Sequence, residues 1–540
     1  MKKWVLGMSV IALILCSVWW SLFDQNAGGY HLITQAKWDK LTTNGTETKL
    51  NLELTYNDTP LAYDEASNTF FLPLAMKDDS FRGTLGAGAD GKTCGLYTTM
   101  NLAKCDVTSL QKNNEAIPLL AVDSGKWEIC YLKITGVPIV SFSSTPDVTA
   151  QALPVFALDV YDTDETRSFH TSCYTTATLH GNTSLAYEKK SLRLKLLKES
   201  DGAYKKANEN LLGLRDDDDW VLNSLYADEN RVRDKLAIDL WNELGAKSNP
   251  FGKSYGTDAA YCEVFINDAY QGLYLLMVPI DAKQLGMPKV SAQLANGTEV
   301  IERLYKKKYT AAYREADFVG ELPDPNMPDY RGGYFLKGDT ILQNEEEWEP
   351  LRLLSHCLEA DDETFGAQII QIVDQQNAIE NWLFFQAIGG FDNALKNIYY
   401  AYRQNGNSGI GYFIPWDLNI SFGCLYADNA FYCETDSAQK TVKELVEWQP
   451  GMRMMETDAN GSVSLAAETW KRFRAGALSD EAFGERVHTL ERTLKESGAF
   501  EREMKRYPDG NCNEDFSFIT SYTKQRLEFI DAYLSERSEQ

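Results

Sequence analysis

Three polar residues in the second half of the chain have the types and spacing that phosphoryl transfer requires. Asp392 is followed five positions later by Asn397, and Asp417 comes 20 positions after Asn397. One carboxylate can orient or deprotonate an attacking hydroxyl, whereas an amide oxygen and a second carboxylate can hold Mg²⁺ or Mn²⁺ on the phosphates of ATP. The order of these residues therefore predicts Asp392 as the catalytic residue and Asn397 and Asp417 as the metal ligands.

The segments around these residues must bring them together. Residues 378–388 are apolar and are predicted to form a helix that ends at Gly389, and the loop with Asp392 and Asn397 follows. Residues 398–402 and 412–414 are predicted strands joined by a polar turn, so the second strand delivers Asp417 at its end. A helix, a D-x-x-x-x-N loop, a hairpin and an aspartate in this order are typical of a protein-kinase catalytic centre.

Phosphoryl transfer also needs a cation on the phosphates, and residues 191–197 are predicted to supply it. This segment alternates between leucine and polar residues, so Arg193 and Lys195 share one face of a predicted strand. We favour Lys195 as the residue that contacts ATP, with Arg193 as the second candidate and Lys190 as a further one. The chain has no G-x-G-x-x-G loop, so cradling of the phosphates would fall to the turn at residues 180–184.

Several blocks of sequence resemble one known family. The blocks are, in chain order, LHGNTSLAYEKKSLRLKL, EVFINDAYQGLYLL, GGYFLKGD, DNALKN and IPWDLNISFG. Together they resemble the CotH family of spore-coat-protein-H-like atypical protein kinases, over about residues 155 to 535. The resemblance implies a kinase that depends on ATP and on Mg or Mn, and that phosphorylates Ser or Thr hydroxyls of envelope or spore-coat-type proteins.

Three positions depart from the family pattern. Val278-Pro279 and Lys337 stand where relatives commonly carry Glu, and Asn419 replaces the second Asp of the W-D-L-D block. Loss of these acidic groups would alter the contacts with the nucleotide. The alternative function is therefore a catalytically weak or inactive pseudokinase that acts as a binding and assembly module at the cell envelope.

The rest of the chain divides into three predicted parts. Residues 1–28 are predicted to be a membrane anchor, and residues 29–150 a small all-β, sandwich-like accessory domain with strands at 49–55, 70–74, 127–135 and 137–142. Residues 151–540 are predicted to form the kinase-like domain, with a β-rich N-lobe over about 151–340 and a helical C-lobe over about 341–540. Residues 282–331 are expected to be an insertion or lid. The predicted fold class is α+β with a bilobal kinase-like domain.

The first residues of the chain predict its location. Lys2 and Lys3 precede an uncharged run over residues 4–23, and Asp24 follows. Such a run can cross a bilayer core, and the positive charges before it place the bulk of the chain outside the cytoplasm. We predict an extracytoplasmic protein anchored in the cell membrane by this helix. A cleaved signal, which would give a secreted protein, is the alternative.

The charge and the cysteines restrict the partners and the covalent structure. A formal net charge of −25 argues against nucleic acid, which is bound through clustered Lys and Arg. It favours a basic protein substrate, and the family resemblance implies a Ser-rich one. Nine of the 10 cysteines follow the predicted anchor, and Cys94 with Cys105 and Cys424 with Cys433 are close enough in sequence to close short loops. Free buried thiols are the alternative for these cysteines.

Overall fold

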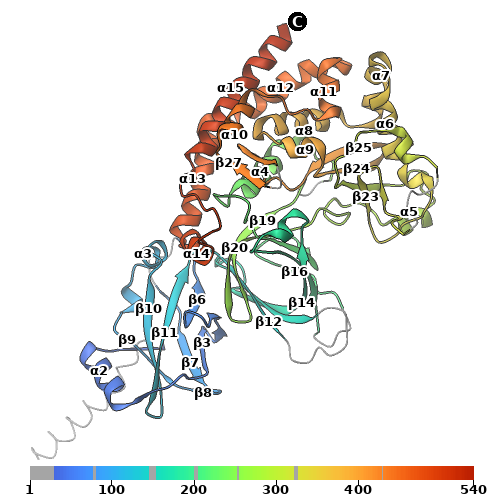
Figure 1. Ribbon diagram of the computed structural model, residues 1–540. Coiled ribbons are helices and arrows are strands. Elements are labelled where there is room, and N and C mark those ends of the chain that lie inside the picture. The colour runs from blue at the N-terminus through green and yellow to red at the C-terminus, as the bar shows by residue number, and fades with distance from the viewer. Residues whose placement is uncertain are drawn as a thin grey trace, which may run out of the picture.

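The computed structural model has an α+β fold in which sheets come first and most of the helices follow (Figure 1). It describes residues 29–76, 81–144, 154–199, 205–251, 255–320, 326–427 and 430–539. The anchor predicted within residues 1–28 lies outside this part of the chain. Among the helices of the described ranges, none combines the length and the apolar character needed to cross a membrane.

The first part of the chain consists of two sheets that share one apolar core. The main path of the larger sheet is, in spatial order, β1 (His31–Leu32), β9 (Gly95–Thr98), β10 (Ala116–Asp123), β11 (Lys126–Thr135), β6 (Thr69–Pro73) and β5 (Ala62–Asp64). A seventh strand, β2 (Thr46–Glu47), pairs with β11 beside this path. The smaller sheet is formed by β4 (Thr59–Pro60), β3 (Leu52–Tyr56), β7 (Leu85–Ala89) and β8 (Lys92–Thr93). Leu54 of one sheet and Leu132 of the other lie in the same buried cluster.

This first part is not all-β, because two helices flank its sheets. Helix α2 (Gln35–Asn44) begins after Thr34, whose side chain accepts a hydrogen bond from the backbone N–H of Lys37. Helix α3 (Val107–Lys112) begins after Asp106, whose carboxylate caps it in the same way. Both are N-caps that satisfy otherwise unpaired backbone donors.

The second part is a closed barrel. Its strands are, in order around the barrel, β12 (Ile139–Ser144), β13 (Val155–Tyr161), β14 (His170–His180), β15 (Ser191–Leu197), β18 (Asp219–Asn223), β20 (Ala269–Met277) and β19 (Ala259–Ile266). On β15 the alternation buries Leu194 and Leu196 in the apolar interior and leaves Arg193 and Lys195 on the outside. The strand predicted at 137–142 is present as β12, but it pairs with β13 and β19 of the barrel and not with the accessory sheets.

A third sheet lies against the helical part. Its strands are, in spatial order, β22 (Tyr330–Arg331), β23 (Tyr334–Lys337), β21 (Arg303–Lys307), β24 (Ile398–Asn405) and β25 (Ser408–Pro415). The segment 282–331, predicted to be an insertion or lid, supplies β21 at the middle of this sheet. This prediction was wrong in that respect, because β21 pairs with both β23 and β24 and is an integral strand.

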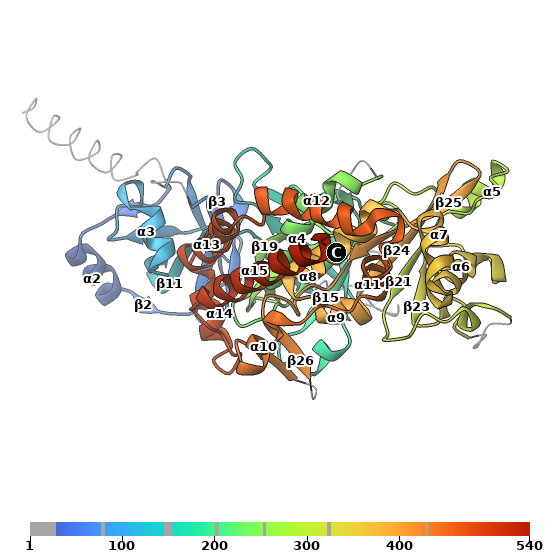
Figure 2. The same ribbon diagram turned by 90° about the horizontal axis from the view of Figure 1, so that it is seen from above.

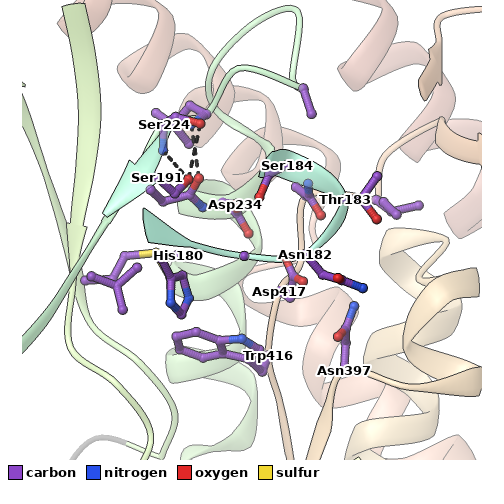
Figure 3. Close-up of a pocket in the computed structure, with 18 of the residues that line it drawn as sticks. His180, Asn182, Thr183, Ser184, Ser191, Ser224, Asp234, Asn397, Trp416 and Asp417 are labelled. Atoms are coloured by element: carbon purple, nitrogen blue, oxygen red, sulfur yellow. Dashed lines mark hydrogen bonds between the residues drawn. The ribbon is translucent and has the colours of Figure 1, made fainter. Parts of the chain in front are cut away.

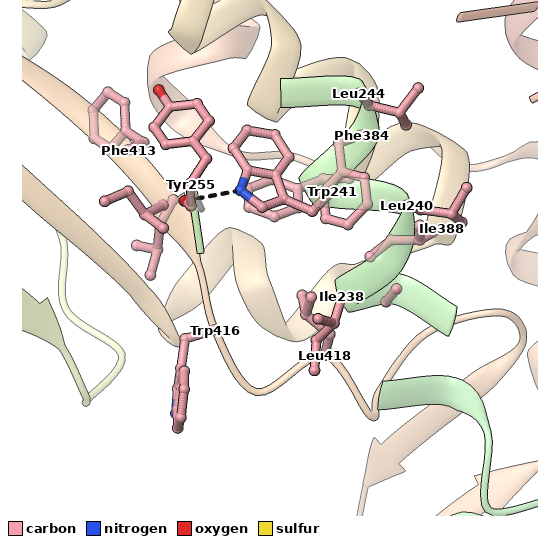
Figure 4. Packing of buried hydrophobic residues seen from close by; sticks show 14 of the residues in the cluster. Ile238, Leu240, Trp241, Leu244, Tyr255, Phe384, Ile388, Phe413, Trp416 and Leu418 are labelled. Carbon is pink, nitrogen blue, oxygen red and sulfur yellow. Dashed lines mark hydrogen bonds between the residues drawn. The ribbon is translucent and has the colours of Figure 1, made fainter. Parts of the chain in front are cut away.

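Helix α4 (Arg233–Leu244) connects the barrel to the helical part through a buried aromatic cluster (Figure 4). The Trp241 ring lies 5.2 Å from the ring of Phe384 on α8 (Gln375–Ile388), and its indole N–H donates to the carbonyl of Tyr255 at 3.3 Å. The remaining helices include α6 (Glu349–Glu359), α7 (Asp362–Ile372), α12 (Ser462–Ala475), α13 (Asp480–Glu496) and α15 (Ser517–Glu539). Seen from above, α15 runs beside α12 and α13 (Figure 2).

A buried cluster of three charges holds helix α14 (Ala499–Arg506) against the barrel. Both Oε atoms of Glu503 lie 2.8 Å from Nζ of Lys189, and Oε1 lies 3.1 Å from Nε of Arg231. All three side chains are fully buried. Burial lowers the pKa of Lys189 from its ordinary value of 10.5 to about 8, although Glu503 opposes that shift. The backbone N–H of Leu273 on β20 donates to Glu503 as well, at 2.9 Å.

The neighbouring residue on α14 connects three parts of the molecule. Arg502 donates to Glu263 of the barrel at 2.6 and 2.9 Å. It also donates to Asn114 at 3.0 Å and to the hydroxyl of Thr135 at 2.6 Å, both in the accessory region. One buried guanidinium therefore holds the accessory sheets, the barrel and the C-terminal helices together.

One of the two predicted cysteine pairs is present. Cys424 and Cys433 form a disulfide between β26 (Cys424–Ala427) and β27 (Ala430–Cys433). Cys94 and Cys105 are free thiols, so the short loop predicted for them is not closed.

Candidate active site

A cavity of about 450 Å³ lies where the barrel, α4, the third sheet and the β26–β27 hairpin meet. Asp392, Asn397 and Asp417 all line it, as does Arg193 from β15. Lys195, the cation favoured from the sequence, does not. The structure therefore brings together the three residues expected to carry the chemistry, and of the candidate cations Lys195, Arg193 and Lys190 it places Arg193 at the cavity.

Asp392 and Asn397 are in direct contact. Residues 391–395, predicted to be a loop, form the short helix α9 (Phe391–Leu395), and Asp392 lies in its first turn. The side-chain amide of Asn397 donates to Oδ2 of Asp392 at 2.6 Å, and Nζ of Lys396 lies 3.4 Å from Oδ1. Burial raises the pKa of Asp392 and the nearby charge of Asp417 raises it further, whereas Lys396 lowers it.

The β24–β25 hairpin explains how Asn397 and Asp417 reach the same cavity. Ile398 at the start of β24 pairs with Pro415 at the end of β25, so the residues just outside the ladder are neighbours. The backbone N–H of Trp416 donates to the carbonyl of Asn397 at 3.0 Å. The amide of buried Asn393 donates to the carbonyls of Asn397 and Trp416, at 3.1 and 3.0 Å. Antiparallel pairing thus closes the 20-residue gap in the sequence.

Both proposed metal ligands have a left-handed backbone, with φ of 57° at Asn397 and 58° at Asp417. Asn and Asp adopt this conformation more readily than other residues with a side chain. The backbone alone therefore favours these residue types at both positions.

The carboxylate of Asp417 faces the cavity with its oxygens available. In the described residues these oxygens have no hydrogen-bond or ion-pair partner, and the side chain is exposed on the wall of the cavity. Partial loss of water around the carboxylate inside the cavity raises the pKa of Asp417, and the charges of Lys306 and Lys396 oppose that shift. Behind it, Asp234 of α4 accepts from the backbone N–H of Leu418 at 2.9 Å. Burial and the charge of Asp417 raise the pKa of Asp234 to about 7.

The residues present fit a divalent cation bound together with phosphates. The amide nitrogen of Asn397 is engaged by Asp392, and within the described chain its amide oxygen has no donor. Figure 3 shows Asn397, Trp416 and Asp417 below the turn that carries Asn182, Thr183 and Ser184. No group of three or more His, Cys, Asp or Glu side chains in the described ranges could hold a metal alone. Mg²⁺ is commonly held by one or two protein groups with phosphate and water completing its shell.

Sequence reasoning missed several residues of the cavity. Lys306 of β21, Lys308 just after that strand and Asp234 of α4 line it and were not foreseen. Lys337 of β23 lines it as well, at a position that the sequence had singled out because relatives commonly carry Glu there. Lys306 and Lys308 belong to the segment that was predicted to be an insertion, so no catalytic surroundings were expected for them. The run of three consecutive lysines at residues 306–308 was the signal in the sequence that could have drawn attention to them.

Comparison with known proteins gives one finding. A family model described as CotH kinase protein matches residues 177–539, which is more than half of the chain. The match begins within β14 and covers every residue of the cavity. No curated protein matches the chain.

Proposed function

Because the chain belongs to the CotH kinase protein family, we propose that it is an extracytoplasmic protein kinase that transfers the γ-phosphate of ATP to Ser or Thr hydroxyls. The observation that carries this proposal is the meeting of Asp392, Asn397 and Asp417 in one cavity, with Asp392 and Asn397 hydrogen-bonded. These are the residue types that hold an acceptor hydroxyl and a metal in phosphoryl transfer. Envelope or spore-coat-type proteins are the proposed substrates.

We propose further that the barrel and the helical part act as the two lobes of a kinase. The cavity lies at their junction, with β15 on one side and the β24–β25 hairpin on the other. Helix α4 packs on the barrel and reaches the cavity through Asp234. That carboxylate holds the backbone N–H of Leu418 and so positions the segment that follows Asp417.

The predicted site residues that line the cavity have distinct tasks in the proposed reaction. Asp392 orients the acceptor hydroxyl and accepts its proton, and Lys396 keeps a positive charge beside it. Asn397 and Asp417 would hold Mg or Mn, which would neutralise the charge of the ATP phosphates when bound. Arg193, and not Lys195, is the β15 cation at the cavity.

Location and substrate charge are part of the proposal. The uncharged run at 4–23, with two lysines before it, supports an anchor with the bulk of the chain outside the cytoplasm. The Cys424–Cys433 disulfide supports an oxidising compartment. The net charge of −25 supports a basic protein substrate, and membership of the CotH kinase protein family supports a Ser-rich one.

Phosphate incorporation from labelled ATP into basic, Ser-rich peptides by the full-length protein, with Mg or Mn, tests the function. Asp392→Ala and Asp417→Asn are each expected to lower incorporation by about a hundredfold or more. The Asp417→Asn variant keeps a residue type that tolerates the left-handed backbone. Asp362→Asn, at an exposed carboxylate on α7, is the control and should leave incorporation unchanged.

Two results would contradict the proposal. Incorporation that survives both Asp392→Ala and Asp417→Asn would show that the phosphate transfer belongs to another site. No incorporation and no metal-dependent ATP binding by the wild-type protein would instead favour the pseudokinase and assembly function.

A further inference from the structure

Three lysines occupy one wall of the cavity because they share a face of the third sheet. Lys306 belongs to β21, and Lys308 follows the last residue of that strand. Residues two apart in an extended chain point to the same side, which groups Lys306 with Lys308. Lys306 pairs across the ladder with Phe335, and Leu304 pairs with Lys337. Cross-strand partners lie on the same face, so the pattern places Lys306, Lys308, Phe335 and Lys337 together. All four line the cavity.

These three lysines form no ion pair within the described residues. Within the described residues no carboxylate lies within 4.0 Å of any of the three amino groups. The contrast is with β15, where Arg193 and Lys195 both bind Asp219, Lys195 at 2.6 Å. The nearest partners of Lys306 are instead aromatic, with its Nζ 5.0 Å from the Trp416 ring and 5.5 Å from the Tyr399 ring.

The cations are close enough to one another to repel. Burial lowers the pKa of Lys306 to about 8, Asp417 opposes this, and Lys337 and Lys308 add to it. Burial also lowers the pKa of Lys337, with Arg193 contributing. At the facing turn, burial lowers the pKa of His180 to about 4, and Lys306 and Arg193 add to the effect. A chain of net charge −25 therefore places three lysines without an ion-pair partner in the described residues on one side of this cavity, which carboxylates such as Asp392 and Asp417 also line.

We propose that Lys306, Lys308 and Lys337 form a polyphosphate subsite on the third sheet, which holds a chain of phosphates beside Asp417. Arg193 and Lys195 are neutralised by Asp219, whereas these lysines have positive charge and hydrogen-bond donors to offer an anion. If the ligand is the triphosphate of ATP, this proposal rests on the proposed kinase function. Free inorganic polyphosphate has the same chemistry and is the other source.

Calorimetric titration of the full-length protein with inorganic tripolyphosphate tests the subsite without requiring phosphate transfer. Lys306→Met is expected to weaken binding by about tenfold or more, because a charge-assisted contact is lost. Lys306→Arg keeps the charge and should retain most of the affinity. Lys337→Glu, which reverses a charge of the wall, should weaken binding at least as much as Lys306→Met. The control is Lys112→Met at an exposed lysine of the accessory region, which should leave binding unchanged.

Parallel titrations with ATP and AMP separate the two sources of phosphate. If the nucleotide occupies the subsite, Lys306→Met will weaken ATP as strongly as tripolyphosphate and will leave AMP nearly unchanged. If ATP is unaffected while tripolyphosphate is weakened, the subsite stands with free polyphosphate as its ligand. Thermal unfolding of each variant identifies any loss of fold. Lys308→Met, at the exposed lysine of the three, is a further variant for the same titrations and is expected to weaken tripolyphosphate binding.

The outcomes that overturn the subsite differ from those that overturn the kinase. Tripolyphosphate that fails to bind the wild-type protein would overturn the subsite. Binding that survives Lys306→Met and Lys337→Glu but is lost in Lys195→Met would overturn it as well. That result would show that residues of β15 bind the phosphates. A wild-type protein that binds tripolyphosphate through Lys306 but transfers no phosphate would overturn the kinase and leave the subsite standing.

Discussion

Replacing Glu503 by Gln should destabilise the fold by an amount that depends on pH. The substitution keeps the volume of the side chain but leaves Lys189 and Arg231 buried without their shared anion. The pKa of Lys189 is already lowered from 10.5 to about 8, which costs the wild-type fold about 3 kcal/mol at pH 7. Without Glu503 the lysine is expected to become neutral on folding, and a neutral lysine at pH 7 costs about 5 kcal/mol.

The pH dependence follows from these values. Between pH 8 and 10.5 the unfolded chain binds more protons than the fold at Lys189, so this group makes the wild type more stable as pH rises through that window. In Glu503→Gln the pKa of Lys189 in the folded protein is lower still, so the pH range in which stability rises with pH begins at a lower pH. The loss due to Lys189 is then about 3 kcal/mol at pH 6, about 1 kcal/mol at pH 7 and near zero at pH 9. Arg231 keeps three backbone carbonyl acceptors and adds a constant loss of about 1.5–3 kcal/mol.

Urea unfolding followed by tryptophan fluorescence at pH 6, 7, 8 and 9 measures this difference in the free energy of unfolding. The expected total at pH 7 is about 3–4 kcal/mol, within the range for a broken buried ion pair. Glu501→Gln is the matched control, because Glu501 lies on the same helix and pairs with Lys505 at the surface. It should cost less than about 0.5 kcal/mol, with no trend over this pH range. A Glu503→Gln loss that is no larger at pH 6 than at pH 9 would refute the buried charge on Lys189.

Three further changes have defined outcomes. Arg502→Met leaves a buried carboxylate without its cation and should lower the free energy of unfolding by about 3–5 kcal/mol; a loss below about 1 kcal/mol in urea unfolding would contradict the bridging role. Gly272→Ala should cost about 1–3 kcal/mol because φ is 93° and an added Cβ would lie 2.2 Å from Oε2 of Glu503; an unchanged melting temperature would show that the backbone can move there. Reduction of the Cys424–Cys433 disulfide, which spans nine positions, should cost about 2–3 kcal/mol. The Cys424→Ser, Cys433→Ser double variant should melt at the temperature of the reduced wild type and lose its sensitivity to reductant.

The site residues on the β24–β25 hairpin could be predicted because their proximity is local. Asn397 and Asp417 flank two strands joined by a short turn, so antiparallel pairing brings them together without any other part of the chain. Their side chains also suit the left-handed backbone found at both positions. The sequence favoured Lys195 over Arg193, whereas Arg193 is the one that lines the cavity. Both residues alternate onto one face of the strand, so the pattern alone does not separate them.

Features that depend on distant pairing could not be predicted. Lys306 reaches the cavity because β21 pairs with β24, a strand that lies about 90 residues later in the chain. Similarly, the segment 137–142 was recognised as a strand from its composition, but its partners β13 and β19 follow from the closure of the barrel. Strand composition identifies an element, whereas its neighbours depend on long-range contacts that no local pattern records.

The position of β12 determines where the chain can be divided. This strand pairs with β13 over six residues and with β19 over four, and its Val140 and Phe142 are buried. A fragment that begins at residue 151 would lack β12 and would present two open strand edges next to an uncovered apolar interior. Such edges template aggregation. A soluble fragment that contains the cavity therefore has to begin no later than residues 136–138, between β11 and β12. Insolubility of a fragment that begins later would reflect the missing strand and would not test the proposed activity.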